Sequence, residues 1–292
     1  MIKGEHLTLQ AKVGILVVLA ALHYTTLALI YAIVRWRRHE LETSDQRKVA
    51  CWIFSLLHSY MGVIAFFHLL TVACWVPGAN FLTDPRCFEW TSPAMELFLL
   101  IPINYYAQDL IITPIVFGDT PLVRQTLFHH LVGVVGALGA LVVRRMVGTI
   151  AVSLLFAECS TIFLMHRSIM LNLKLDKDPK YKKFYVGNGI VLVVTFFLTR
   201  VLFMGVLLLF YMVPLMFSFD YTLAIAQIGL WRIVLAYTLL ILFGFLYVLN
   251  IFWFGKMFSG LLKFLKKSEE VGYYPDAKGK EEALIDKNEE AQ

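Results

Sequence analysis

Two adjacent histidines, His129 and His130, lie within an apolar segment of the chain. Neighbouring residues on an α-helix point about 100° apart, so one imidazole can face a cavity while the other faces a neighbouring helix. The helical rise of about 1.5 Å per residue places Asp109, in the preceding apolar segment, at a similar depth. Because a carboxylate can orient an imidazole for proton transfer, we predict that these three residues are catalytic.

Four further polar residues in apolar segments are predicted to bind the substrate. An ionisable side chain inside a bilayer is costly unless it is paired or faces a cavity. The four are His58, Glu158, Arg200 and Asn250. For Glu158 and Arg200, a structural ion pair is the more economical alternative. We expect His68 to have a packing role, and His166 and Arg167 to reach the membrane interface.

The sequence predicts neither a metal site nor a bound cofactor. Histidine clusters that bind two iron ions contain several HxxxH or HxxHH groups, which the eight histidines of this chain do not form. The four cysteines also lack CxxC spacing. Cys74 and Cys87 are expected in the lumenal connection between the second and third spans, where either a disulfide or two free thiols can occur.

The composition shows which elements must position these residues. The 292 residues are 59% hydrophobic and 16% charged, with a mean hydropathy of +0.70. Such a chain is too apolar for a water-soluble domain, and long apolar segments in lipid must form helices to satisfy their own backbone. The net charge of +5 comes from short clusters of Lys and Arg, so nucleic acid is not an expected partner. We predict an all-α, polytopic integral membrane protein.

Apolar segments of about 20 residues predict transmembrane helices. Seven such segments cover residues 13–34, 49–76, 94–116, 122–143, 148–171, 184–211 and 233–255. The stretch 186–217 contains Arg200 and Pro214, and we interpret it as a single tilted helix with an irregular end.

Positive charge predicts the orientation of these spans, because short cytosolic loops are enriched in Lys and Arg. The loops after the first and fifth spans and the segment after the last are basic. The N-terminus is therefore expected in the lumen and the C-terminus in the cytosol, although Arg144 and Arg145 fall on the opposite side. Residues 1–44 would form the N-terminal span and its basic loop, and the polar residues 268–292 a disordered tail.

The polar groups of the last six spans occur in short motifs with a definite order. These are SLLHS at 55–59, YAQD at 106–109, FHH at 128–130, ECST at 158–161, FFLTR at 196–200 and NIFWF at 250–254. In this order the chain resembles the TLC-domain family, named for the TRAM proteins, the longevity-assurance ceramide synthases and the ceroid-lipofuscinosis membrane protein. The resemblance covers residues 45–265 and implies six helices around a lipid cavity, preceded by one N-terminal span.

The resemblance also implies a chemistry. In the ceramide synthase branch, paired histidines serve to transfer a fatty acyl group from CoA to a sphingoid amine. By that resemblance His129 or His130 is a general base or a transient acyl acceptor, Asp109 orients it, and acyl-CoA is the co-substrate. Residues 158–161 depart from the ceramide synthase pattern and are more similar to the TLC-domain-containing and ceroid-lipofuscinosis branch, which is associated with membrane lipid composition.

We therefore expect a protein of membrane lipid homeostasis in the endoplasmic reticulum, whose partner is a membrane lipid. The predicted chemistry is acyl transfer to a sphingoid lipid or a glycerophospholipid, and the enzyme class is an acyl-CoA-dependent acyltransferase. The alternative is a non-catalytic protein for lipid binding, sensing or trafficking. A transporter is less favoured, because Pro102 and Pro114 interrupt the third span and no later span has a matching break.

Overall fold

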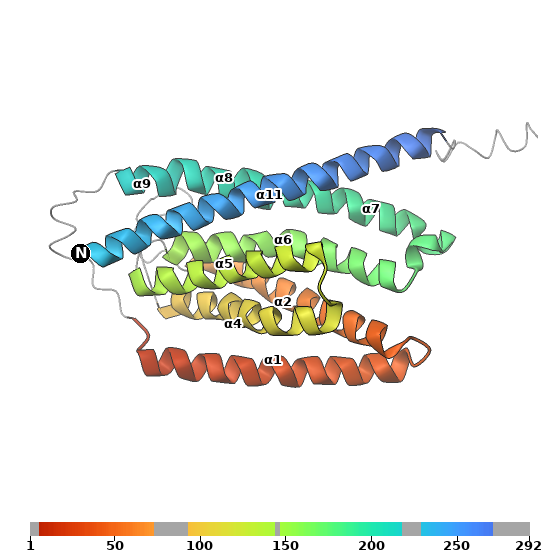
Figure 1. Ribbon diagram of the computed structural model, residues 1–292, viewed down its shortest axis with the longest axis horizontal. Helices are drawn as coiled ribbons and strands as arrows, with labels where there is room; N and C mark the ends of the chain where they lie inside the picture. Colours follow the sequence, from red (N-terminus) through yellow and green to blue (C-terminus); the bar gives the residue numbers. More distant parts are fainter. Residues whose placement is uncertain (1–5, 73–92, 144–146, 218–228, 271–292) are drawn as a thin grey trace, which may run out of the picture.

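The computed structural model describes residues 6–72, 93–143, 147–217 and 229–270 (Figure 1). All regular structure in these ranges is helical, and seven helical segments are long and apolar enough to cross a membrane. This confirms the predicted all-α, multi-pass membrane fold. Helices suit such a chain because each satisfies its own backbone hydrogen bonds, which lipid cannot do.

The spans agree with the predicted segments to within a few residues at most ends. They are α1 (Leu9–Arg37), α2 (Thr43–Val72), α4 (Pro93–Phe117), α5 (Pro121–Val143), α6 (Val147–Asn172), the stretch that begins with α7 (Pro179–Phe196), and α11 (Leu230–Glu270). A short 3₁₀-helix, Leu175–Lys177, joins α6 to α7. The clearest difference is α11, which continues well past residue 255, the end predicted for the last span.

The stretch after α7 is one continuous helix, as predicted, but it is irregular in the middle as well as at its end. Phe197–Phe203 and Leu207–Met212 are wound as π-helix, and α8 (Met204–Val206) and α9 (Val213–Phe217) follow them in turn. A π turn holds an extra residue, so it rotates the side chains that it carries relative to a regular helix. Arg200 lies in the first of these π segments.

Local sequence fixes the helix ends. Pro93, Pro121 and Pro179 each begin a helix, where the missing N–H of proline costs nothing. After α4, Gly118 adopts a φ of 71°, a left-handed conformation that ends the helix with little strain. Asp119 follows in the same turn, and the guanidinium of Arg124, in the first turn of α5, hydrogen-bonds both of its oxygens at 2.6 Å and lowers the pKa of that carboxyl group.

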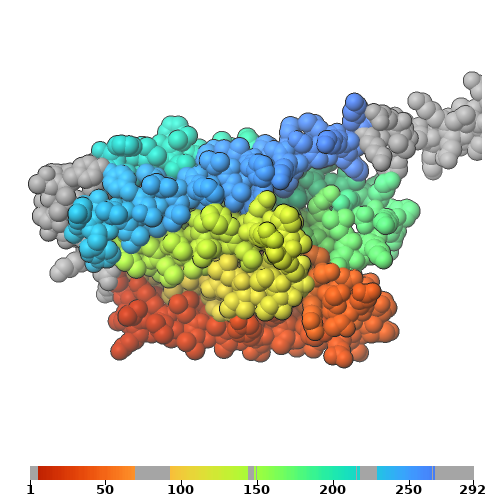
Figure 2. Space-filling model, viewed as in Figure 1, coloured from red at the N-terminus to blue at the C-terminus, as the bar shows by residue number. Residues whose placement is uncertain are grey.

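The helices lie side by side along the long axis of the molecule (Figure 1). α1 forms one edge, α7–α9 and α11 form the opposite edge, and α2, α4, α5 and α6 fill the space between them. α11 lies on the surface of the bundle along most of its length (Figure 2). Large apolar side chains also cover the outside, Ile115 and Ile241 among them. In water such a surface would aggregate, whereas lipid solvates it.

Small and medium-sized apolar residues from the central helices make the core. Leu69, Met95, Leu99, Ala137 and Leu239 are at most 1% exposed, and they belong to one cluster that joins α2, α4, α5 and α11. Three sequence predictions lie outside the described residues: the pairing of Cys74 with Cys87, the loop with Arg144 and Arg145, and the conformation of the tail beyond Glu270.

Candidate functional site

Asp109 on α4 and His130 on α5 form the closest contact between predicted catalytic residues. Oδ2 of Asp109 lies 2.7 Å from Nδ1 of His130, and the side chains are 17% and 13% exposed. The two atoms are within hydrogen-bond distance, but the contact lacks the alignment of a regular hydrogen bond. The other oxygen, Oδ1, accepts a hydrogen bond from Thr113 at 2.8 Å. The carboxylate is therefore held in place beside the imidazole.

A tyrosine connects this pair to a buried carboxylate on α6. The ring of Tyr106 stacks on that of His130, with centroids 4.7 Å apart. Its hydroxyl donates a hydrogen bond to Oε1 of Glu158 at 3.2 Å, and Ser59 on α2 donates to Oε2 at 2.7 Å. One set of polar groups thus spans four helices, α2, α4, α5 and α6, within the interior of the bundle.

The ion pair expected between Glu158 and Arg200 was a wrong prediction. Nε of Arg200 donates to Ser160 and an Nη donates to Thr161, each at 2.9 Å. No ion pair joins Arg200 to Glu158 in the described part of the chain. The reason is position, because Ser160 and Thr161 lie about 3–4.5 Å further along α6. Hydroxyl groups, rather than opposite charges, therefore satisfy both buried residues.

His129 faces a different neighbour from His130. Its ring lies 5.3 Å from that of Trp253 on α11, and the indole N–H of Trp253 donates to Gln125 at 3.1 Å. The described residues offer Nδ1 of His129 no hydrogen-bond partner. Asp109 therefore contacts one member of the histidine pair, His130, while the second member lies against α11.

Asn250 lies in the same helix as Trp253 and is only 1% exposed. Its amide Nδ2 donates to the sulfur of Met204 at 3.5 Å. Its oxygen has no partner among the described residues. Asn250 therefore contacts α8, and its buried side-chain oxygen accepts no hydrogen bond from the described residues.

His58 stacks on Tyr105, with ring centroids 3.8 Å apart and planes at 7°. Tyr105 in turn donates a hydrogen bond to Ser55 at 2.7 Å. Nε2 of His58 is buried without a partner in the described ranges. His68, by contrast, is exposed and meets the edge of Phe98, so it stands apart from the other histidines.

His23 on α1 belongs to this group and was missed in the sequence. It is 5% exposed, its ring lies 4.2 Å from that of Phe54, and it lies 6.2 Å from Tyr105. The neighbouring Tyr24 donates a hydrogen bond to Gln108, next to Asp109 in the sequence. The criterion that selected the other histidines, a titratable group within an apolar span, would have found His23 had it been applied to the first span.

Glu96, in the first turn of α4, is a second residue that was missed. Its side chain is fully buried, and Oε1 lies 3.1 Å from both Nδ1 of His6 and Nζ of Lys12. Oε2 accepts a hydrogen bond from the backbone N–H of Leu7 at 2.9 Å. The start of a helix favours a carboxylate, because free N–H groups point towards it. This cluster fixes the N-terminal segment to α4.

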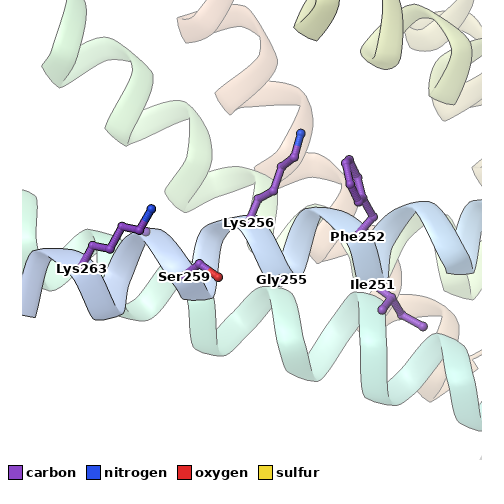
Figure 3. Close-up of a pocket in the computed structure, with 7 residues that line it drawn as sticks. Ile251, Phe252, Gly255, Lys256, Ser259 and Lys263 are labelled. Atoms are coloured by element: carbon purple, nitrogen blue, oxygen red, sulfur yellow. The ribbon is translucent and has the colours of Figure 1, made fainter.

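A groove of about 550 Å³ runs along the second half of α11 (Figure 3). Phe252 and Lys256 point to one side of the helix there, and the ammonium group of Lys256 lies 4.2 Å from the phenyl centroid. Lys263 and Ser259 also line it. None of the predicted site residues borders this groove, so the lipid cavity around the histidine pair stays a prediction.

The contact between Asp109 and His130 can support acid–base chemistry. An imidazole held at Nδ1 by a carboxylate keeps Nε2 for a substrate, which is the arrangement of a general base and its orienting group. In the described ranges, no three His, Cys, Asp or Glu side chains are grouped as metal ligands would be.

Comparison with known proteins identifies the family. No curated protein sequence matches this chain significantly. The family model described as the TLC domain, which covers the TRAM, LAG1 and CLN8 proteins, matches residues 48–259. This match includes most of α2, all of α4 to α9 and most of α11, and it leaves α1 outside. The chain therefore belongs to the TLC-domain family, and its function is connected with membrane lipids.

Proposed function

We propose that the protein transfers an acyl chain from acyl-CoA to a membrane lipid, with His130 as the general base. The observation that carries this proposal is the 2.7 Å contact between Asp109 and His130. A carboxylate in this position orients the ring and stabilises the imidazolium that forms when the base accepts a proton. The acceptor would be a sphingoid lipid or a glycerophospholipid, within the endoplasmic reticulum.

The reaction balances with these groups alone. Nε2 of His130 removes the proton from the amine or hydroxyl of the acceptor lipid as that atom attacks the thioester carbonyl. The bond from the carbonyl carbon to sulfur breaks, and a new amide or ester bond forms. The imidazolium then returns the proton to the departing thiolate of CoA, so that His130 is neutral again for the next cycle.

Unsatisfied buried atoms suggest which residues bind the substrate. A buried polar atom without a partner is costly, so it is a natural place for a ligand group. Such atoms are found on His58, His129 and Asn250. Glu158 and Arg200 already have hydroxyl partners, so their part in substrate binding would be to hold the surrounding helices in position.

A second candidate function is non-catalytic lipid binding, sensing or trafficking. It is favoured by one observation, which is that the groove on α11 contains none of the histidines. Both functions require a lipid, but only acyl transfer requires a base. Consumption of acyl-CoA therefore distinguishes the two functions.

The test is an acyl-transfer assay on purified protein with labelled palmitoyl-CoA and either a sphingoid base or a lysophospholipid as acceptor. We expect His130→Ala and Asp109→Asn to lower kcat by a factor on the order of 10²–10⁴, the usual contribution of a general base. His68→Ala is the matched control, since this exposed histidine lies apart from the pair, and it should keep wild-type kcat.

Thermal unfolding of each variant in detergent checks that it is folded. If folded His130→Ala protein releases CoA and forms product as fast as the wild type, acyl transfer at His130 is wrong. If no variant and no wild-type preparation consumes acyl-CoA, while lipid still co-purifies with the wild type, the non-catalytic function is favoured instead.

A further inference from the structure

A second groove, of about 330 Å³, lies where α1, α4, α5 and α11 meet. Leu16 on α1, Leu100 on α4 and Leu138 and Leu141 on α5 give it apolar walls. Figure 2 shows α5 on the surface between α1 and α11 on this face of the molecule. The groove involves neither histidine of the candidate site. It is therefore a separate feature from the proposed acyl-transfer centre.

Two cationic residues, Lys12 and Arg232, lie on this groove. The ammonium group of Lys12 lies 3.1 Å from Glu96, so its charge is compensated. Arg232 has no carboxylate within ion-pair distance among the described residues, and its buried Nε lacks a hydrogen-bond partner there. Its guanidinium carbon lies 5.0 Å from the ring centroid of Trp231. The groove thus combines leucine walls with one positive charge that no carboxylate of the described residues compensates.

We propose that this groove binds an anionic glycerophospholipid, with one acyl chain against the leucines and the phosphodiester on Arg232. A phosphodiester carries a single negative charge, which matches the single uncompensated guanidinium. Guanidinium groups bind phosphate oxygens through two parallel hydrogen bonds, so the lipid would satisfy the Nε that has no partner. An acyl chain suits the walls, because they are apolar.

The position of the groove suggests what the bound lipid does. Its walls come from both α1 and α11, the helices nearest the two ends of the chain. Lys12, Val13 and Leu16 lie outside the TLC-domain match at residues 48–259. A lipid held there joins the N-terminal helix to the TLC domain, so it should stabilise the whole bundle.

The test is native mass spectrometry of the full-length protein, delipidated and then mixed with phosphatidylglycerol or with diacylglycerol of the same acyl chains, which lacks the phosphodiester. The wild type should retain phosphatidylglycerol roughly tenfold better than diacylglycerol, as expected for charge-assisted hydrogen bonds to the phosphodiester. Arg232→Gln should lose this preference, and Arg232→Lys, which keeps the charge, should retain part of it.

A matched pair of substitutions on α5 tests the apolar walls. Leu138 lines the groove, whereas Leu131 lies two turns earlier on the same helix and is similarly exposed. Leu138→Trp should abolish retention of phosphatidylglycerol, and Leu131→Trp should leave it unchanged. If Arg232→Gln does not fold, these two tryptophan variants still test whether the groove binds phosphatidylglycerol.

Two results would overturn the proposal. One is equal retention of both lipids by the wild type, which indicates ordinary surrounding lipid. The other is an equal loss of phosphatidylglycerol retention in Leu131→Trp and Leu138→Trp, which indicates that the groove is not the lipid-binding site. Neither result bears on acyl transfer, which is measured by CoA release at a separate set of residues.

Discussion

At the scale of single residues, the most informative group is the carboxylate of Glu158. It is 4% exposed, and its two oxygens accept hydrogen bonds from Ser59 and Tyr106. A buried carboxylate needs strong donors, and two hydroxyl groups from two other helices provide them. Glu158 therefore acts as a polar junction of α2, α4 and α6, directly beside the tyrosine on which His130 stacks.

The substitution Glu158→Leu should destabilise the protein more than Glu158→Gln. Leucine leaves the buried Tyr106 hydroxyl without its acceptor, at about 1–3 kcal/mol, and the Ser59 hydroxyl keeps only the Ser55 carbonyl oxygen at 2.9 Å. Glutamine still offers an oxygen to one hydroxyl, and its NH₂ can donate to the other. Thermal unfolding in detergent measures the difference.

A double-mutant cycle provides the control for this prediction. Ser59→Ala removes one of the hydroxyls, so it should cost less in the Glu158→Leu background than in the wild type. Strictly additive effects would mean that the hydrogen bond at 2.7 Å contributes nothing to stability.

At the scale of helices, α2 and α6 approach each other closely at Gly62. A Cβ atom at this position would lie 2.9 Å from Cγ and 3.2 Å from Cβ of Glu158. Gly62→Ala should therefore push Glu158 away from its hydroxyl partners and destabilise the bundle by about 1–3 kcal/mol, the usual cost of overpacking.

Gly136 on α5 is the matched control for Gly62. A Cβ there would meet nothing within 4 Å. Gly136→Ala should thus be neutral or stabilising by up to about 1 kcal/mol, because alanine is the better helix former. The measurement is again thermal unfolding, and equal losses for the two variants would contradict close packing at Gly62.

The helices could be predicted from sequence far better than their internal irregularities. A run of about 20 apolar residues is a strong constraint in lipid, so the sequence predicts the seven spans with small errors at most ends, the C-terminal end of α11 being the exception. The π turns around Arg200 were not found, because apolar periodicity does not distinguish one extra residue in a turn. That extra residue contributes to placing Arg200 opposite Ser160 and Thr161 rather than Glu158.

The candidate site could be predicted in part for a similar reason. Counting residues along helices gave the depth of Asp109 and of the histidine pair, but depth does not say which histidine faces α4. The rotation of α5 decides this, and it favours His130. His23 was missed because α1 was treated as an addition to the domain. Its 4.2 Å contact with Phe54 shows that α1 packs against the site.

At the scale of the whole molecule, α1 is an integral part of the bundle although the family match begins at residue 48. Two polar connections fasten it. The cluster at Glu96 involves His6, Leu7 and Lys12, and Tyr24, near the middle of α1, donates a hydrogen bond to Gln108 on α4. We expect that weakening the Glu96 cluster destabilises the whole protein rather than α1 alone.

Lys12→Met tests this expectation against a matched ion pair. Lys12 and Lys48 each lie 3.1 Å from a carboxylate, but the Lys12–Glu96 pair is 14% and 0% exposed while the Lys48–Asp45 pair is 32% and 34% exposed. Lys12→Met should cost about 1–3 kcal/mol, because Glu96 keeps His6 and the Leu7 N–H as partners. Lys48→Met should cost less than about 1 kcal/mol, as for exposed pairs.

A second substitution, Glu96→Gln, shows whether the stability lost in Lys12→Met comes from the uncompensated charge of Glu96. In the Lys12→Met background it removes the buried negative charge, so it should restore part of the lost stability, whereas in the wild type it should be destabilising. A single cooperative unfolding transition at lower temperature would mean that α1 and the TLC domain unfold together. If α1 instead unfolds in a separate, earlier transition, and the midpoint of the main transition is unchanged, then α1 is only loosely attached.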